Sequence, residues 1–307
     1  MPEPTIHPAA LPNTLSCSEL RVRPGPDGAA IAITPQRACW RYLSFRVVRL
    51  AHGESIDVGI DAQEAVIVTI GGGGVRIEFG SARGGIDLPG RSSPFEALPW
   101  AAYTPAGMSA RVVGRPVASG TDPRAVVAIA EAPRSGSPAA ATAPFVVAPN
   151  DVEIEVRGAG NATRQINKII APESAADRLE VVEVLTPSGN WSSWPPHKHD
   201  RDEMPDEAVL EEIYYYRFRR PGAWAVQRVY RPDRSRDCLL EVHDGDCLMV
   251  TDGYHPFVAA HGDDAYYLNA LAGDRRTMAC SFDPDLDWVR DTWADTAPDP
   301  RVPLVGR

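Results

Sequence analysis

The chain has 307 residues, of which 44% are hydrophobic and 23% charged, a composition typical of soluble globular proteins and not of disordered ones. Its formal net charge of -10 argues against nucleic acid or an anionic membrane as partner, because phosphates are bound by an excess of lysine and arginine. An acidic small molecule is compatible with this charge, since binding it needs only one or two local arginines.

The start of the chain shows no secretion signal, because residues 1–13 contain four prolines and no apolar run. The longest apolar stretches have about six residues, far fewer than the roughly 20 that cross a bilayer. The cysteines are scattered and form no Cys-x-x-Cys pair, which predicts free, buried thiols and a cytoplasmic protein. They are Cys17, Cys39, Cys238, Cys247 and Cys280.

Short strand-like segments dominate the first half of the sequence. The chain holds 29 prolines and 25 glycines and few long helical patterns, which favours strands joined by turns. We expect strands within residues 41–58, 65–79, 109–113 and 125–132. Inside 65–79, four consecutive glycines separate two apolar segments, and this pattern predicts a hairpin.

Residues 135–144, SGSPAAATAP, are small and include proline, so they are interpreted as a linker. The strand pattern then restarts, and the segment 283–296 has a helical pattern. The expected strands lie within 152–156, 179–185, 212–218, 224–230, 238–243, 246–250 and 266–273. We therefore predict an all-β protein with two tandem β-barrels, one domain of residues 1–134 and one of residues 145–307. A single large sandwich is the alternative.

The most informative segment is NWSSWPPHKHD. Its His197 and His199 are separated by one residue, so on an extended backbone both side chains face the same side and can hold one metal ion. A carboxylate follows at Glu211 or Glu212, and His255 comes just after a turn. An isolated His-x-His pair is more often a surface pair, but the added carboxylate and third imidazole favour a metal site. Three histidines and one glutamate leave coordination positions open, as catalysis requires.

The other histidines lack such surroundings, and we expect them not to bind metal: His7, His52, His243 and His261. In the first half, the places where a metal-binding barrel would carry its ligands contain no histidine. We therefore expect the first barrel to have kept the fold and lost the metal, with roles in packing, in oligomerisation and in closing the site.

Several longer segments resemble the 5-deoxy-glucuronate isomerase family of myo-inositol catabolism. In chain order they are RGAGNATRQIN (157–167), GNWSSWPPHKHD (189–200), LEEIYYYRF (210–218), QRVY (227–230), DGDCLMVTDGYHP (244–256) and YYLNALAG (266–273). Weaker matches at 40–54 and 89–107 extend the resemblance over nearly the whole chain. The resemblance implies a bicupin fold with a metal in the second barrel. It also implies conversion of 5-deoxy-D-glucuronate to 5-dehydro-2-deoxy-D-gluconate.

By the same resemblance, the metal ligands are His197, His199, Glu212 and His255. Glu212 is preferred to Glu211 because related 4-deoxy-hexulose-uronate isomerases use the glutamate directly before the hydrophobic-aromatic strand, and Glu212 precedes IYYY. The sequence does not identify the divalent metal, since Zn, Mn, Fe, Co and Ni all accept this set of nitrogen and oxygen ligands.

The implied reaction moves a hydrogen between adjacent carbons, through an enediolate-like state or a hydride shift, and needs a cation for the distal carboxylate. Arg228 is our first candidate for that cation and Arg164 the second. Arg217 is disfavoured because strand parity places it on the opposite face from Glu212. Four polar residues are expected near the site and could move a proton, although each could simply pack: Tyr216, Gln227, Tyr254 and Tyr267.

Two other functions compete with the isomerase. One is a metal-dependent cupin dioxygenase, since histidine and carboxylate sites with open positions also suit iron and oxygen. The other is a non-enzymatic cupin that binds a sugar acid. We expect a small sugar-acid substrate and neither nucleic acid nor a membrane as partner, and the sequence leaves a homo-oligomer open.

Overall fold

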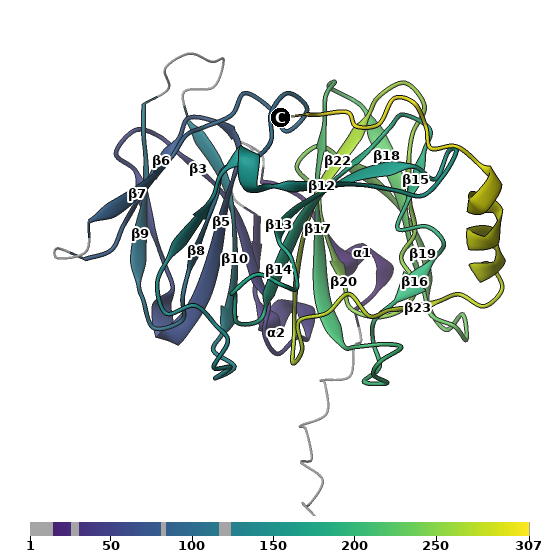
Figure 1. Ribbon diagram of the computed structural model, residues 1–307, viewed down its shortest axis with the longest axis horizontal. Coiled ribbons are helices and arrows are strands. Elements are labelled where there is room, and N and C mark those ends of the chain that lie inside the picture. Colours follow the sequence, from purple (N-terminus) through teal and green to yellow (C-terminus); the bar gives the residue numbers. More distant parts are fainter. Residues whose placement is uncertain (1–14, 26–30, 81–83, 117–123, 307) are drawn as a thin grey trace, which may run out of the picture.

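The computed structural model describes residues 15–25, 31–80, 84–116 and 124–306. It shows two β-barrels side by side (Figure 1). Each barrel combines one large sheet with one four-stranded sheet. The large sheets meet in the middle of the molecule, and the four-stranded sheets form its outer walls. The fold is an all-β bicupin, as predicted from the sequence.

The first barrel contains a six-stranded sheet of order β11-β8-β5-β10-β3-β2 and a four-stranded sheet of order β4-β9-β6-β7. All neighbouring strands are antiparallel. The bounds are β2 (Ile31–Ile33), β3 (Ser44–Leu50), β4 (Ser55–Val58), β5 (Gln63–Gly72), β6 (Val75–Glu78), β7 (Gly85–Leu88), β8 (Ala101–Thr104), β9 (Ala110–Gly114), β10 (Ala125–Pro133) and β11 (Phe145–Val147).

The second barrel contains a seven-stranded sheet of order β1-β20-β17-β22-β14-β13-β12, a four-stranded sheet of order β15-β21-β18-β19, and the pair β16-β23. The bounds are β1 (Arg21–Val22), β12 (Glu153–Arg157), β13 (Arg164–Ile170), β14 (Leu179–Thr186), β15 (Trp191–Ser192), β16 (His197–Lys198), β17 (Leu210–Phe218), β18 (Trp224–Tyr230), β19 (Asp237–His243), β20 (Cys247–Val250), β21 (Phe257–Ala259), β22 (Ala265–Gly273) and β23 (Ser281–Phe282).

Helices are short and few. Within the described residues, two are α-helices, α1 (Cys17–Leu20) and α2 (Pro35–Ala38), and three are 3-10 helices, η1 (Ile60–Ala62), η2 (Pro149–Asp151) and η3 (Asp287–Asp295). The helical pattern of residues 283–296 is thus confirmed, in the tighter 3-10 form. No helix in the described parts of the chain is long and apolar enough to cross a membrane.

The two barrels repeat one strand order. In the large sheets, β8-β5-β10-β3-β2 corresponds to β20-β17-β22-β14-β13. Each large sheet ends in a short strand from the other half: β1 precedes the first barrel yet pairs with β20, and β11 follows the 135–144 segment yet pairs with β8. The domain boundary at 135–144 remains a prediction. Strand β1 lies before it in the chain but belongs to the sheet of the second barrel, and β11 lies after it but belongs to the sheet of the first.

Three large apolar clusters form most of the core in the described residues, and a small fourth one contains Ala208, Leu210 and Leu271. One fills the first barrel, one fills the second, and the largest lies between the two large sheets. Strand β14 shows how one strand serves two clusters, because all its residues are buried. Val182 and Val184 point into the second barrel, whereas Val181 and Leu185 pack between the sheets.

Two carboxylates at equivalent strand starts join the barrels. Glu64 in β5 accepts hydrogen bonds at 2.6–2.7 Å from the backbone N–H groups of residues 177–179, which lead into β14. Glu211 in β17 likewise accepts at 2.6–2.9 Å from residues 41–43, which lead into β3. Each barrel therefore holds the entry to a central strand of the other.

The predicted hairpin within 65–79 is wrong. Strand β5 pairs with β8 and β10, whereas β6 pairs with β7 and β9 in the other sheet. The glycine run instead carries the chain from one wall of the barrel to the other. Close backbone approach explains the small residues, since a Cβ at Gly90 would lie 2.1 Å from the carbonyl oxygen of Gly72.

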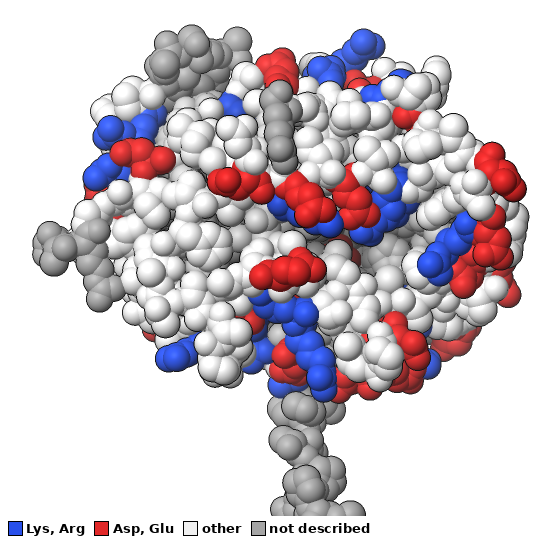
Figure 2. All heavy atoms as spheres, in the orientation of Figure 1, with Lys and Arg blue, Asp and Glu red and all other residues white. Residues whose placement is uncertain are grey.

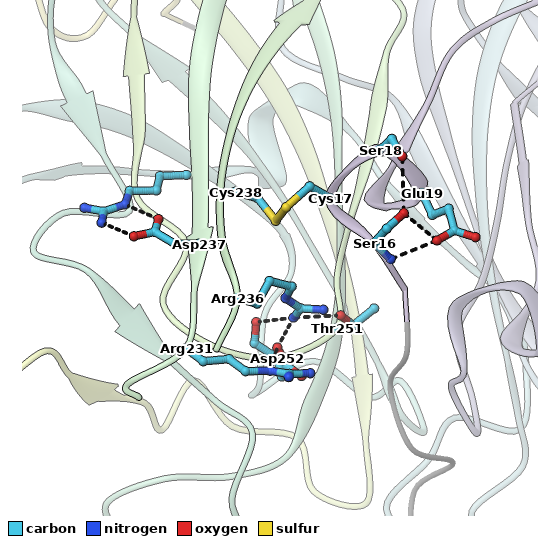
Figure 3. The surroundings of a disulfide bond; sticks show 11 residues. Ser16, Cys17, Ser18, Glu19, Arg231, Arg236, Asp237, Cys238, Thr251 and Asp252 are labelled. Atoms are coloured by element: carbon cyan, nitrogen blue, oxygen red, sulfur yellow. Dashed lines mark hydrogen bonds and ion pairs between the residues drawn. A yellow bond between two sulfur atoms is a disulfide. The ribbon is translucent and has the colours of Figure 1, made fainter. Parts of the chain in front are cut away.

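A disulfide between Cys17 and Cys238 fastens α1 to β19 (Figure 3), with Cα atoms 5.4 Å apart. The prediction of five free thiols is therefore wrong for this pair, while Cys39, Cys247 and Cys280 are free. The two bonded residues are 221 positions apart, so no local spacing could indicate the bond. Because disulfides are rare in a reducing cytoplasm, the cysteines no longer support that location, which stays a prediction.

Charges are mixed on the face drawn in Figure 2. Acidic and basic side chains lie close together there, and neither sign covers a continuous area. The formal excess of -10 therefore does not create a single acidic surface on this face.

Candidate metal centre

Three buried side chains meet inside the second barrel. His199 follows β16, Glu212 lies on β17, and His255 lies between β20 and β21. Their ligand atoms all lie within 4.8 Å of one another, and no other such group of three occurs in the parts of the chain that the structure describes. Glu212 is on the inward face of β17, which it shares with Tyr214 and Tyr216 of the barrel core.

The two imidazole rings are held by their Nδ1 atoms. Nδ1–H of His199 donates to the Leu210 carbonyl at 2.8 Å, and Nδ1–H of His255 donates to the Gly253 carbonyl at 3.0 Å. Such bonds fix the ring orientation and direct Nε2 at a common point, an arrangement typical of metal-binding histidines.

The Nε2 atoms converge on one carboxylate oxygen. Glu212 Oε2 lies 2.9 Å from Nε2 of His199 and 3.3 Å from Nε2 of His255. Nε2 of His255 is buried without a hydrogen-bond partner. An orphaned imidazole nitrogen beside a buried carboxylate fits a shared cation, because both are electron-pair donors.

The ionisation of the rings agrees with this chemistry. Burial lowers the pKa of His255 to about 3, so its ring is neutral at physiological pH and able to ligate. Burial also disfavours the charged form of His199, but the hydrogen bond to Glu212, the charge of Glu212 and backbone hydrogen bonds together outweigh that effect and raise the pKa of His199. The proton shared by His199 Nε2 and Glu212 Oε2 lies where a bound metal ion would be.

His197, the fourth predicted ligand, lies beside this group and not within it. Its ring centroid is 4.7 Å from that of His255 and 6.4 Å from that of His199. Burial lowers the pKa of His197 to about 3, so this ring is also neutral. His52, His243 and His261 belong to no such group, and His7 lies outside the described residues.

The neighbouring glutamates perform different tasks, and this leads to a matched prediction. We expect Glu212→Gln to weaken metal binding strongly. Glu211→Gln should retain metal, but should destabilise the fold by about 1–3 kcal/mol because one acceptor oxygen for three backbone N–H groups becomes a donor. Metal content and thermal unfolding measured on both variants will check this. Metal loss in the Glu211 variant alone would mean that the strand is shifted by one residue.

The four predicted polar residues are buried, and most already have partners. The Tyr216 hydroxyl donates to Gln227 at 3.0 Å, and Gln227 in turn donates to the carbonyls of His255 and Pro256. The Tyr267 hydroxyl donates to Ser192 at 2.9 Å. Tyr254 packs on another tyrosine, Tyr230, with ring centroids 5.3 Å apart.

Sequence reasoning missed a tyrosine nearer the cluster. The Tyr214 ring is 6.0 Å from that of His255, and its hydroxyl shares a 2.8 Å hydrogen bond with Ser193. Burial raises the pKa of Tyr214 well above 10, so the phenol stays protonated. Its inward parity with Glu212 was visible in the sequence, and that signal could have identified it.

The two arginine candidates lie in opposite environments. Arg164 is 6% exposed, and its Nη1–H groups donate to the carbonyls of Ala162 and Trp194 at 3.2 Å. No carboxylate among the described residues pairs with it, and burial lowers its pKa to about 10, so it remains charged. It lies close enough to His197 to lower the pKa of that ring.

Arg228 does not face the barrel interior, which reverses our preference. On β18, Ala225 and Val229 pack inside the barrel, so Arg228 points outward by parity. Its side chain is 40% exposed and pairs with Asp237 at 2.6 Å. Arg217 also faces away from Glu212, as predicted, and pairs with Asp244 at 2.7 Å.

A cavity of about 940 Å³ at the seam between the barrels is lined by one residue of the cluster, His199. Residues 38–42 of the first barrel line one side, and His199, Leu210 and Glu211 line the other. The first barrel therefore provides part of the lining of a cavity that His199, a candidate metal ligand, also lines.

Comparisons with known proteins agree on one family. Residues 20–289 match the KduI/IolB family. The 5-deoxy-glucuronate isomerase of Geobacillus kaustophilus is 39% identical over 271 residues, which are 88% of this chain and 93% of that protein. The corresponding isomerase of Geobacillus thermodenitrificans is 38% identical over 270 residues, 88% of this chain and 94% of that one.

Solved structures show the same relationship. An IolB-like protein from Salmonella typhimurium is 33% identical with a TM-score of 0.80, covering 88% of this chain and 99% of that one. An oxalate decarboxylase from Lactobacillus farciminis is 12% identical with a TM-score of 0.57, covering 86% and 88%. The similarity to the oxalate decarboxylase shows a shared fold only.

Proposed function

The chain belongs to the KduI/IolB family, and we propose that it isomerises 5-deoxy-D-glucuronate to 5-dehydro-2-deoxy-D-gluconate in myo-inositol catabolism. Relatives named 5-deoxy-glucuronate isomerase match it over most of its length, so it is an isomerase of this family. The observation that carries the proposal is the convergence of His199, Glu212 and His255 in a barrel that also buries an unpaired arginine.

We further propose that His199, Glu212 and His255, with His197, hold a divalent metal ion. The candidates are Zn, Mn, Fe, Co and Ni, which all accept imidazole and carboxylate. A bound divalent ion supplies Lewis acidity for the charge that develops on the substrate oxygens. The residues themselves contribute orientation, because the Nδ1 bonds of His199 and His255 hold both rings in place before any ligand binds.

Arg164 is the residue we propose for the substrate carboxylate. Its parity with Ile166 of the barrel core turns it into the barrel, where its charge interacts with Tyr267 and Tyr214. A buried guanidinium without an anion costs free energy that a bound carboxylate would recover through charge-assisted hydrogen bonds. This arrangement would orient the sugar acid with its aldehyde end toward Glu212.

The buried tyrosines are suited to donate hydrogen bonds and not to accept protons. Burial raises the pKa values of Tyr216, Tyr254 and Tyr267 above their usual range, so each keeps its proton at neutral pH. Their partners, among them Gln227 and Ser192, hold them in place. We propose that they shape the polar wall around the substrate.

The direct test uses purified protein loaded with each divalent metal in turn. We expect 5-deoxy-D-glucuronate to be consumed without oxygen uptake. Carbon-13 NMR should show a ketone forming at C2 of the substrate, which is numbered C5 in the product. Oxygen consumption would favour the dioxygenase alternative, and saturable binding without conversion would favour a sugar-acid-binding protein.

A further inference from the structure

A second carboxylate lies on the same face of the same sheet as the candidate metal centre, two strands away from Glu212. Glu180 on β14 and Glu212 on β17 are both in register with Leu271 on β22, which lies between those strands. Two strand spacings separate their backbones, about 10 Å. Both side chains point into the barrel, because Val182 on β14 and Tyr214 on β17 have the same parity and belong to its core.

Glu180 is buried with little stabilisation of its charge. The residue is 1% exposed, and neither carboxylate oxygen makes a hydrogen bond of normal geometry, although the Thr277 backbone N–H and the charge of Arg276 lie near enough to favour its charged form. The comparable buried acids of the chain are satisfied: Glu64 and Glu211 by backbone N–H groups, and Glu183 by Arg91 and Tyr266. A buried carboxylate without hydrogen bonds lowers the stability of the fold. A structural role therefore does not explain Glu180, and a functional one is the alternative.

The surroundings of Glu180 move its pKa toward neutral pH. Burial raises its pKa to about 7, although Arg276, the Thr277 backbone N–H and His199 act in the opposite direction and Glu173 adds to the rise. Arg276 is already engaged with the carbonyls of Ser174, Ala176 and Ala171. A general base works best when its pKa is near the working pH, whereas a carboxylate that ligates metal is a poor base.

We propose that Glu180 is the base that moves the proton between C1 and C2 of the sugar acid, an inference that rests on the proposed isomerase function. A divalent ion held by Glu212 and the histidines would bind the aldehyde end, and Glu180 would approach from β14, two strands away in the same sheet. Leu271, between the two glutamates, packs toward Ala208 and Leu210.

The step is balanced without any co-reactant. The C2–H bond breaks, its proton goes to a Glu180 oxygen, and the electron pair forms the C1–C2 double bond of an enediolate with its charge on the C1 oxygen. Glu180 then returns the proton to C1, and the C2 hydroxyl proton passes to the C1 oxygen, which leaves a ketone at C2. Glu180 ends as it began, so no oxidant or reductant is consumed.

Glu180→Gln tests the proposal because it keeps shape and removes the proton carrier. We expect kcat to fall about 100- to 10,000-fold, with metal content and melting temperature retained. In the wild type, kcat should fall as pH drops through about 7, because the protonated acid cannot accept a proton. Glu173→Gln is the control: this exposed side chain only raises the pKa of Glu180, so its loss should preserve kcat and move the acidic limb to lower pH.

A second measurement does not depend on turnover. In protein labelled with carbon-13 at the glutamate carboxyl, one signal should titrate near pH 7 in the wild type and be missing from Glu180→Gln. Normal kcat in Glu180→Gln, or a wild-type profile that is flat between about pH 6 and about pH 8, would overturn the proposal and favour a hydride shift. If metal-loaded wild type does not convert the substrate at all, the proposed isomerase function is rejected. The carbon-13 signal then still reports whether Glu180 gains and loses a proton near pH 7.

Discussion

His255→Ala should yield a protein that binds no divalent metal and has no isomerase activity. The variant removes the one ring nitrogen of the cluster that is buried without a hydrogen-bond partner. The remaining Nε2 of His199 and the carboxylate of Glu212 are already hydrogen-bonded to each other at 2.9 Å, so a metal ion would have to displace that contact with fewer ligands. Elemental analysis of the purified variant after metal loading gives the result directly.

The matched control is His243→Ala. His243 lies on the outer sheet, is 41% exposed at its side chain and pairs with Glu241 at 2.7 Å. Its loss should leave metal content at the wild-type level. Full occupancy in His255→Ala would reject the proposed ligand set, whereas loss of metal in both variants would point to a general effect of removing histidine.

Arg164→Met should reduce kcat/KM about 30- to 1000-fold while metal content stays intact. Methionine retains much of the buried stem but removes the charge, so the loss corresponds to a carboxylate without its cation, about 2–4 kcal/mol. The free energy of unfolding of Arg164→Met should be equal to that of the wild type or higher. Because Arg164 is buried without an anion, replacing it with an apolar side chain relieves a desolvation cost.

Arg228→Met provides the comparison, since Arg228 lies on the outer face of the same barrel and pairs with Asp237. We expect its kcat/KM to stay within about threefold of the wild type. If instead Arg228→Met loses activity and Arg164→Met does not, substrate must bind on the outer face. Steady-state kinetics and thermal unfolding on both variants separate recognition from packing.

Much of the candidate centre could be predicted because its signals are local. The spacing of His197 and His199 and the position of Glu212 before an aromatic strand follow from the alternation of a β-strand. His255 required the resemblance to a family as well, because its partners are brought together only by the closure of the barrel.

Other features depend on the environment of a whole strand. On β18, both faces carry apolar residues, so the sequence WAVQRVY does not show that Arg228 points outward. Strand β14 is buried on both faces because the first barrel covers its outer side, and the sequence LEVVEVL therefore did not show that Glu180 points into the second barrel. The wrong hairpin prediction has a similar cause, because the sequence does not show that β5 and β6 belong to different sheets.

The paired strand starts also limit what can be removed from this chain. Glu64 and Glu211 occupy equivalent positions and make equivalent bonds to the opposite barrel. The next residue differs: Glu212 belongs to the candidate metal centre, whereas Ala65 packs in the core of the first barrel. The barrel without the candidate ligands still binds the entry of β14 through Glu64, so deleting that barrel should destabilise the one that carries the candidate centre.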